Sequence, residues 1–245
     1  MKTAVKLIVL LILTATFFQG CATPVVNKPA DVLYKEGEDF YKDGRYEDAI
    51  ASWKKVKETY QSPELTTKAE LNIADAYFLN KDYIEAAAGY EDFRKLHPKH
   101  PQAGFALYRQ GMSHYNQIHG IDTDQTPVKN AQITFDSYLK LYPTDLQFAE
   151  VKEKHRDCRD KQMQYELYVG RFYLKTDAYK AAIARFEESL KMFADSARRD
   201  EVLFYLGKAY LEDGQKAKGR EVLGQLIKDF PASPFIADAK KVMDK

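Results

Sequence analysis

A small residue recurs at a nearly constant interval along the chain, and an aromatic or histidine residue follows each copy three positions later. The small residues are Gly37, Ala74, Gly111, Gly170 and Gly207, followed by Phe40, Tyr77, His114, Tyr173 and Tyr210. Their spacings are 37, 37, 59 and 37 residues. A period in the thirties is typical of repeat proteins, whose units bury their apolar faces only by stacking on one another.

A second series of small residues lies behind the first, and a bulky residue follows each member four positions later. The pairs are Ala49 and Trp53, Ala86 and Tyr90, Ala131 and Phe135, Ala182 and Phe186, and Gly219 and Leu223. Three units then close with Pro98, Pro143 and Pro231. This order resembles the tetratricopeptide repeat (TPR). It predicts an all-α solenoid of five helical hairpins, about ten helices, with a C-terminal capping helix over residues 235–243.

Two insertions interrupt the regular spacing. Repeat three has eight extra residues, which predict a loop over residues 118–126. Its Asp122 and Asp124 lack the central Gly and final Glu of an EF-hand, so Thr126 is the better reading, as the N-cap of the next helix. A further 14 residues after Pro143 predict one long helix over residues 145–175, between repeats three and four. The predicted divisions are therefore 30–143 for repeats one to three and 144–245 for the rest.

The first residues carry a targeting signal. Lys2 and Lys6 precede a short apolar run, which ends at Gly20-Cys21. This arrangement predicts a signal peptide over residues 1–20, and the sequence before Cys21 resembles a bacterial lipobox. Cys21 is then the lipidation site, residues 21–29 are a tether, and Ala22 favours the outer membrane. A secreted soluble protein with a free Cys is the alternative.

Composition and motifs exclude several kinds of function. A formal net charge of +1 gives no basic excess for nucleic acid. The chain carries no nucleophile with a His partner in a known motif, no Gly-rich phosphate loop and no metal cluster, so we expect neither an enzyme nor a cofactor beyond the lipid on Cys21. His97 and His100 lie in a turn without a carboxylate nearby in the sequence, which disfavours a metal site.

Two stretches in the second half carry a more specific resemblance. Residues 164–173 read Gln-Tyr-Glu-Leu-Tyr-Val-Gly-Arg-Phe-Tyr, and residues 179–186 read Tyr-Lys-Ala-Ala-Ile-Ala-Arg-Phe. Together with the lipobox, the five repeats and the Asp-x-Asp-Gln-Thr loop, they resemble the BamD (ComL-like) lipoproteins of the outer-membrane β-barrel assembly machinery. Many members have Arg where Thr123 stands, so this chain lacks the guanidinium group that those members carry in the loop.

The resemblance implies a non-enzymatic lipoprotein on the periplasmic side of the outer membrane of a Gram-negative bacterium. It implies binding to the periplasmic POTRA domains of a BamA-like barrel protein through the C-terminal half, together with other assembly lipoproteins. It also implies that unfolded outer-membrane proteins bind to the N-terminal repeats. For the barrel partner, the candidate contacts are Arg171 and Arg185, although Arg185 can equally form an ion pair within the chain.

Substrate contacts are predicted on the first helix of each N-terminal hairpin, which lines the concave face of a TPR array. The outward positions form an apolar and aromatic stripe with two acids: Tyr34, Glu38, Tyr41, Leu71, Asp75, Phe78, Tyr108, Met112 and Tyr115. We expect a groove for an extended, aromatic-rich peptide, the alternative being that these side chains pack against the next repeat. Competing functions are another periplasmic TPR adaptor lipoprotein, linked to Tol-Pal or peptidoglycan, and a cytosolic TPR co-chaperone, which the signal peptide disfavours.

Overall fold

Helices are the only regular elements between residues 28 and 244, the part of the chain that this computed structural model describes. The predicted signal peptide, Cys21 and most of the tether lie outside the described residues. The helices form five pairs and a final single helix: α2 (Ala30–Lys42) and α3 (Tyr46–Thr59), α4 (Pro63–Leu79) and α5 (Tyr83–Leu96), α6 (Ala103–Asn116) and α7 (Thr126–Leu141), α8 (Phe148–Lys175) and α9 (Tyr179–Met192), α10 (Arg199–Glu212) and α11 (Lys216–Asp229), then α12 (Ile236–Met243).

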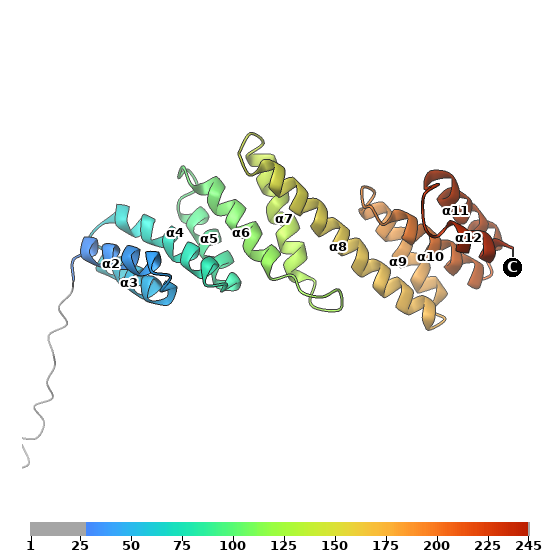
Figure 1. Ribbon diagram of the computed structural model, residues 1–245, viewed down its shortest axis with the longest axis horizontal. Coiled ribbons are helices and arrows are strands. Elements are labelled where there is room, and N and C mark those ends of the chain that lie inside the picture. The colour runs from blue at the N-terminus through green and yellow to red at the C-terminus, as the bar shows by residue number, and fades with distance from the viewer. Residues whose placement is uncertain (1–27, 245) are drawn as a thin grey trace, which may run out of the picture.

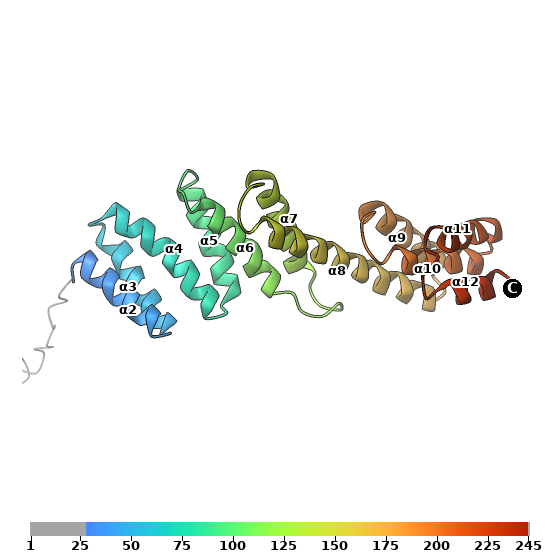
Figure 2. The ribbon, with the colours of Figure 1, turned by 45° about the horizontal axis from the view of Figure 1, so that its top comes forward.

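The pairs stack side by side into an elongated array, with α2 at one end and α12 at the other (Figure 1). Each helix packs on the next one in the chain, and α8 crosses between the two halves (Figure 2). The prediction of an all-α solenoid of five hairpins with a capping helix is confirmed.

The small residues allow the two helices of each hairpin to approach closely. A Cβ atom on Gly111 would lie 2.5 Å from the Phe135 ring, and one on Gly207 would lie 2.5 Å from Leu223. Both distances are shorter than van der Waals contact, so only glycine fits. In repeat two the arrangement is reversed, because Ala74 supplies the Cβ and Gly89 on the second helix leaves the space for it.

Four hairpins turn through a residue in the left-handed region. These residues are Gly44 (φ 74°), Lys81 (φ 68°), Asp177 (φ 58°) and Gly214 (φ 79°). Glycine adopts this conformation without strain, whereas Lys and Asp are less suited to it. Repeat three instead carries the inserted loop, over residues 117–125.

The long helix and the loop differ in detail from the prediction. α8 begins at Phe148 rather than at residue 145, because residues 142–148 form turns. Its 28 residues span about 42 Å at 1.5 Å per residue. In the loop, the prediction of Thr126 as N-cap is wrong by one residue, because Gln125 occupies the N-cap position and Thr126 is the first residue of α7. Asp124 Oδ1 accepts hydrogen bonds from both the backbone N–H (2.9 Å) and the hydroxyl (2.8 Å) of Thr126.

One histidine has a partner that its sequence neighbours did not reveal. His97 Nε2 lies 2.7 Å from Glu70 Oε2, across the boundary between α4 and the end of α5. The carboxylate partner of His97 is thus 27 residues away in the sequence and is brought close by the fold. Among residues 28–244, however, no group of three or more His, Cys, Asp or Glu side chains is placed to hold a metal ion.

Candidate binding surfaces

Three tyrosines of the predicted N-terminal groove have hydroxyls that are bonded to the following repeat. The hydrogen bonds join Tyr34 to Asn72 of α4 (2.9 Å), Tyr108 to Glu150 of α8 (3.1 Å) and Tyr115 to Asp157 of α8 (2.6 Å). These hydroxyls connect neighbouring repeats, as the packing alternative anticipated. Only the exposed parts of the three rings remain for a ligand.

Two other predicted groove residues are largely enclosed. Leu71 is 4% exposed and belongs to the apolar core, so it offers no surface to a ligand. Asp75 accepts a hydrogen bond from the Tyr90 hydroxyl, and its carboxylate lies 4.0 Å from Arg109 Nε. Burial raises the pKa of Asp75, against the opposing effect of the Tyr90 hydrogen bond. The acidic part of the stripe is therefore smaller than the sequence suggested.

The remaining four residues of the stripe, Glu38, Tyr41, Phe78 and Met112, are half-buried. The Tyr41 ring packs edge-on to the Tyr46 ring at 5.6 Å, and the Arg109 guanidinium lies 4.3 Å from the centre of the Phe78 ring. An aromatic surface remains on repeats one to three, narrower than predicted. Its role as a substrate groove stays a prediction.

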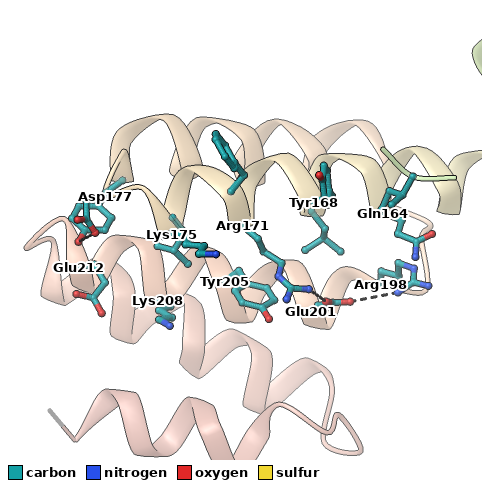
Figure 3. A pocket seen from close by; sticks show the side chains of 15 residues that line it. Gln164, Tyr168, Arg171, Lys175, Asp177, Arg198, Glu201, Tyr205, Lys208 and Glu212 are labelled. Carbon is teal, nitrogen blue, oxygen red and sulfur yellow. Dashed lines mark hydrogen bonds and ion pairs between the residues drawn. The ribbon is translucent and has the colours of Figure 1, made fainter. Parts of the chain in front are cut away.

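A groove lies between α8 and α10, in repeats four and five (Figure 3). Its volume is about 860 Å³. Four lining residues from each helix share one spacing, i, i+4, i+7 and i+11, which places them on one helix face. They are Gln164, Tyr168, Arg171 and Lys175 on α8, and Glu201, Tyr205, Lys208 and Glu212 on α10. Ile121 of the repeat-three loop also lines the groove.

The charges in this groove are partly paired. Glu201 lies between Arg171 (3.6 Å) and Arg198 (3.4 Å), and the Arg171 guanidinium lies 4.8 Å from the centre of the Tyr205 ring (Figure 3). Within residues 28–244, Lys175 and Lys208 form no ion pair. The groove therefore presents two ammonium groups that are available to a partner's carboxylates.

Two aromatic side chains of α8 are unusually open to solvent beside these cations. Tyr168 is 50% exposed and Phe172 is 59% exposed, and both line the groove. Exposed aromatic rings next to Arg and Lys are typical of protein interfaces, where the rings supply apolar area and the cations supply orientation. The groove therefore fits a peptide segment that carries both apolar and acidic side chains.

Arg185 lies on α9, outside this groove. Its Nη1 donates a hydrogen bond to Glu166 Oε2 (3.1 Å), so the ion pair within the chain that the sequence left open is present. The Arg185 side chain is still 46% exposed. Arg171 and Arg185 are thus not brought together, and contact with a partner stays a prediction for each.

Sequence reasoning named Arg171 as a candidate contact but did not name Tyr168, Phe172 or Lys175, which line the same groove. The signal was available, because Tyr168 and Phe172, and Arg171 and Lys175, each lie four residues apart. Such pairs share a helix face.

No helix among the described residues is both long enough and apolar enough to cross a lipid bilayer.

Comparison with known proteins gives a consistent result across nearly the whole chain. The family YfiO, described as "Outer membrane lipoprotein", matches residues 26–223. The "Outer membrane protein assembly factor BamD" of Caulobacter vibrioides is 25% identical over 240 residues, covering 95% of this chain and 79% of that protein. The protein of the same name from Rickettsia prowazekii is 26% identical over 242 residues, covering 97% and 96%.

Among solved structures, the "TPR2AB-domain:pHSP90-complex of yeast Sti1" aligns with a TM-score of 0.44 and 14% identity. The alignment covers 88% of this chain and 83% of that one.

Proposed function

The chain belongs to the YfiO family of outer membrane lipoproteins, and we propose that it works by binding, as a lipid-anchored scaffold of the β-barrel assembly machinery. Its relatives over nearly the full length are outer membrane protein assembly factors, so an assembly role at the outer membrane is the premise. The finer proposal concerns what each half of the array binds.

We assign the anchor to Cys21. The family is one of lipoproteins, and Cys21 follows a predicted signal peptide. Acylation of Cys21 by two or more chains makes membrane attachment stable where a single chain is marginal. The repeats then lie on the periplasmic side.

The groove between α8 and α10 is assigned to the barrel partner, a BamA-like protein with POTRA domains. The observation that carries this assignment is the pairing of two free ammonium groups, Lys175 and Lys208, with two exposed aromatic rings, Tyr168 and Phe172. The N-terminal aromatic face, around Tyr41 and Phe78, is the proposed site for unfolded outer-membrane proteins.

The experiment reverses the two free cations together and measures recovery of the barrel protein in a mild-detergent pull-down from the outer membrane. With Lys175→Glu and Lys208→Glu, recovery falls about tenfold or more, because like charges then face the partner's acids. The matched control is Lys180→Glu with Lys216→Glu, two exposed lysines at the starts of α9 and α11, outside the groove. This control leaves recovery unchanged.

Unchanged recovery with the groove variant contradicts the assignment of the groove. Recovery of Tol or Pal proteins in place of a barrel protein, with the unmodified chain, contradicts the proposed function itself and favours the other class of periplasmic TPR adaptor.

A further inference from the structure

Three successive second helices of the array end on the same pair of residues, a lysine followed by a large apolar residue. These pairs are Lys95-Leu96 at the end of α5, Lys140-Leu141 at the end of α7 and Lys191-Met192 at the end of α9. A lysine in the last helical turn has an ordinary explanation, since it complements the helix dipole. The apolar residue after it has no such explanation unless it is buried.

The three apolar side chains are not buried. Leu96 is 63% exposed, Leu141 is 61% exposed and Met192 is 46% exposed. Two further residues of the connections between repeats are more open still, since Tyr60 is 90% exposed and Leu146 is 94% exposed. These side chains protrude from the surface rather than pack between helices, so hairpin packing does not account for them.

These residues lie along one edge of the array. The connections from α5 to α6, from α7 to α8 and from α9 to α10 follow one another on the same long side in both views (Figures 1 and 2). This edge is formed by the ends of the second helices and the connections that follow them, and we call it the inter-repeat edge. It is separate from the α8–α10 groove, because none of the groove-lining residues belongs to it except Arg198, at the last position of its connection.

The chain enters the array at this edge. The backbone N–H of Ala30, the first residue of α2, donates a hydrogen bond to the side chain of Gln61 in the connection between α3 and α4 (3.1 Å). Cys21 lies nine positions before Ala30, and nine steps of fully extended chain span at most about 30 Å. A lipid on Cys21 therefore holds this end of the inter-repeat edge close to the bilayer.

The charge of the edge fits an anionic surface. Across the described part of the chain, Lys99, Lys140 and Lys191 are exposed and form no ion pair, whereas Lys95 is paired with Glu91. Of the two acids in these connections, Asp195 is paired with Arg159, whereas Asp145 keeps its negative charge and accepts a hydrogen bond from the Leu146 N–H (2.9 Å). Lysines beside protruding apolar side chains suit a phospholipid interface, where the ammonium groups meet headgroups and the apolar groups enter the acyl boundary.

We propose that the inter-repeat edge lies on the phospholipid surface of the membrane, with Leu96, Leu141 and Met192 inserted at the headgroup boundary. In this orientation the long axis of the array runs parallel to the membrane. The inference rests on the membrane location of the family and not on the partner proposed for the groove, so the two can fail separately.

The test uses the full acylated chain in vesicles of phosphatidylethanolamine and phosphatidylglycerol whose acyl chains carry nitroxides. Leu96→Cys, Leu141→Cys and Met192→Cys are each labelled with a fluorophore. Cys158 stays unlabelled, because it is fully buried and burial raises the pKa of its thiol to about 12. The matched control is Ile84→Cys, which is 70% exposed but lies at the other end of α5.

We expect the acyl-chain nitroxides to quench the fluorophore at 96, 141 and 192 and not at 84. Lys140→Glu with Lys191→Glu reduces the quenching at 96, whereas Lys180→Glu, at the opposite end of α9, does not. Equal quenching at 84 and at the three edge positions, or none at any of them, overturns the proposal. Shielding of the edge labels that appears only after the barrel protein is added also overturns it, since the edge is then a protein interface.

Discussion

At the scale of single residues, the fold depends on where side chains are absent. Gly111 and Gly207 each leave the space that Phe135 and Leu223 fill, and Gly170 does the same for Phe186. The bulky residues are fully buried, so the missing Cβ is matched by a ring or a branched chain. The fixed spacing of the small residues thus marks the positions at which two helices are in close contact.

Gly170→Ala tests this account of close packing, and Gly224→Ala is its control. A Cβ at 170 would overlap the Phe186 ring, and overpacking of this kind destabilises by about 1–3 kcal/mol. Gly224, inside α11, has nothing within 4 Å of a Cβ. Gly224→Ala therefore stabilises by about 0.5–1 kcal/mol through helix propensity. Urea denaturation measures the free energy of unfolding of both variants. A Gly170→Ala variant as stable as the parent contradicts the packing account.

The buried carboxyl of Asp75 gives a prediction about pH. Its folded pKa is raised by burial, so the folded state holds a proton that the unfolded state has already released, and stability falls as pH rises through that window. Asp75→Asn removes the ionisation and keeps an acceptor for the Tyr90 hydroxyl. The melting temperature of the Asn variant relative to the parent should therefore rise from pH 4 towards neutral. A difference that shrinks over this range contradicts the account.

The core at this scale was predictable, and the polar pairings were not. Trp53, Tyr90 and Phe135 were expected to be bulky anchors, and all are fully buried. The bond between His97 and Glu70 joins residues 27 positions apart, and that between Tyr108 and Glu150 spans 42. Such pairs depend on how the repeats stack on one another. The spacing of residues within one repeat does not specify this stacking.

At the scale of elements, α8 distinguishes this array from a regular one. The Arg159 guanidinium donates hydrogen bonds to Asp195 and to the carbonyl oxygen of Met192 (2.9 Å), and Asp160 accepts one from the Ala197 N–H (3.2 Å). The inserted turns of α8 are therefore fastened to the connection between α9 and α10. The helix itself was predicted from the 14 extra residues after Pro143. Its delayed start was not, because it depends on turns at residues 142–148.

The hairpin turns give a prediction at the same scale. Lys81 has φ 68°, a conformation that costs non-glycine residues about 1–2 kcal/mol, while Gly44 occupies the equivalent place in repeat one at φ 74°. Allowing for the flexibility of glycine in the unfolded chain, Lys81→Gly stabilises by about 0.5–1 kcal/mol. Gly44→Ala, which meets no atom within 4 Å, destabilises by a similar amount. Calorimetry measures the melting temperature of both variants. Shifts of the same sign contradict this account of the turns.

At the scale of the whole molecule, the N-terminal and C-terminal halves of the array present different surfaces. The N-terminal stripe was predicted as an open groove, but several of its side chains are committed to contacts between repeats. An open groove lies between α8 and α10, in repeats four and five. The spacing of residues alone predicted which side chains share one face of a helix. It did not predict how far two such faces stand apart, since that distance depends on packing across a whole repeat.

The central claim is that the α8–α10 groove holds the barrel partner. The most direct measurement places a photo-crosslinking amino acid at Tyr168 or Phe172, and at Ile84 as the exposed control, in the acylated chain within the native outer membrane. The account predicts a crosslink to a large β-barrel protein with periplasmic domains from 168 and 172, and none from 84. Crosslinks to that protein from 84 but not from the groove, or crosslinks from the groove only to other proteins, would contradict it.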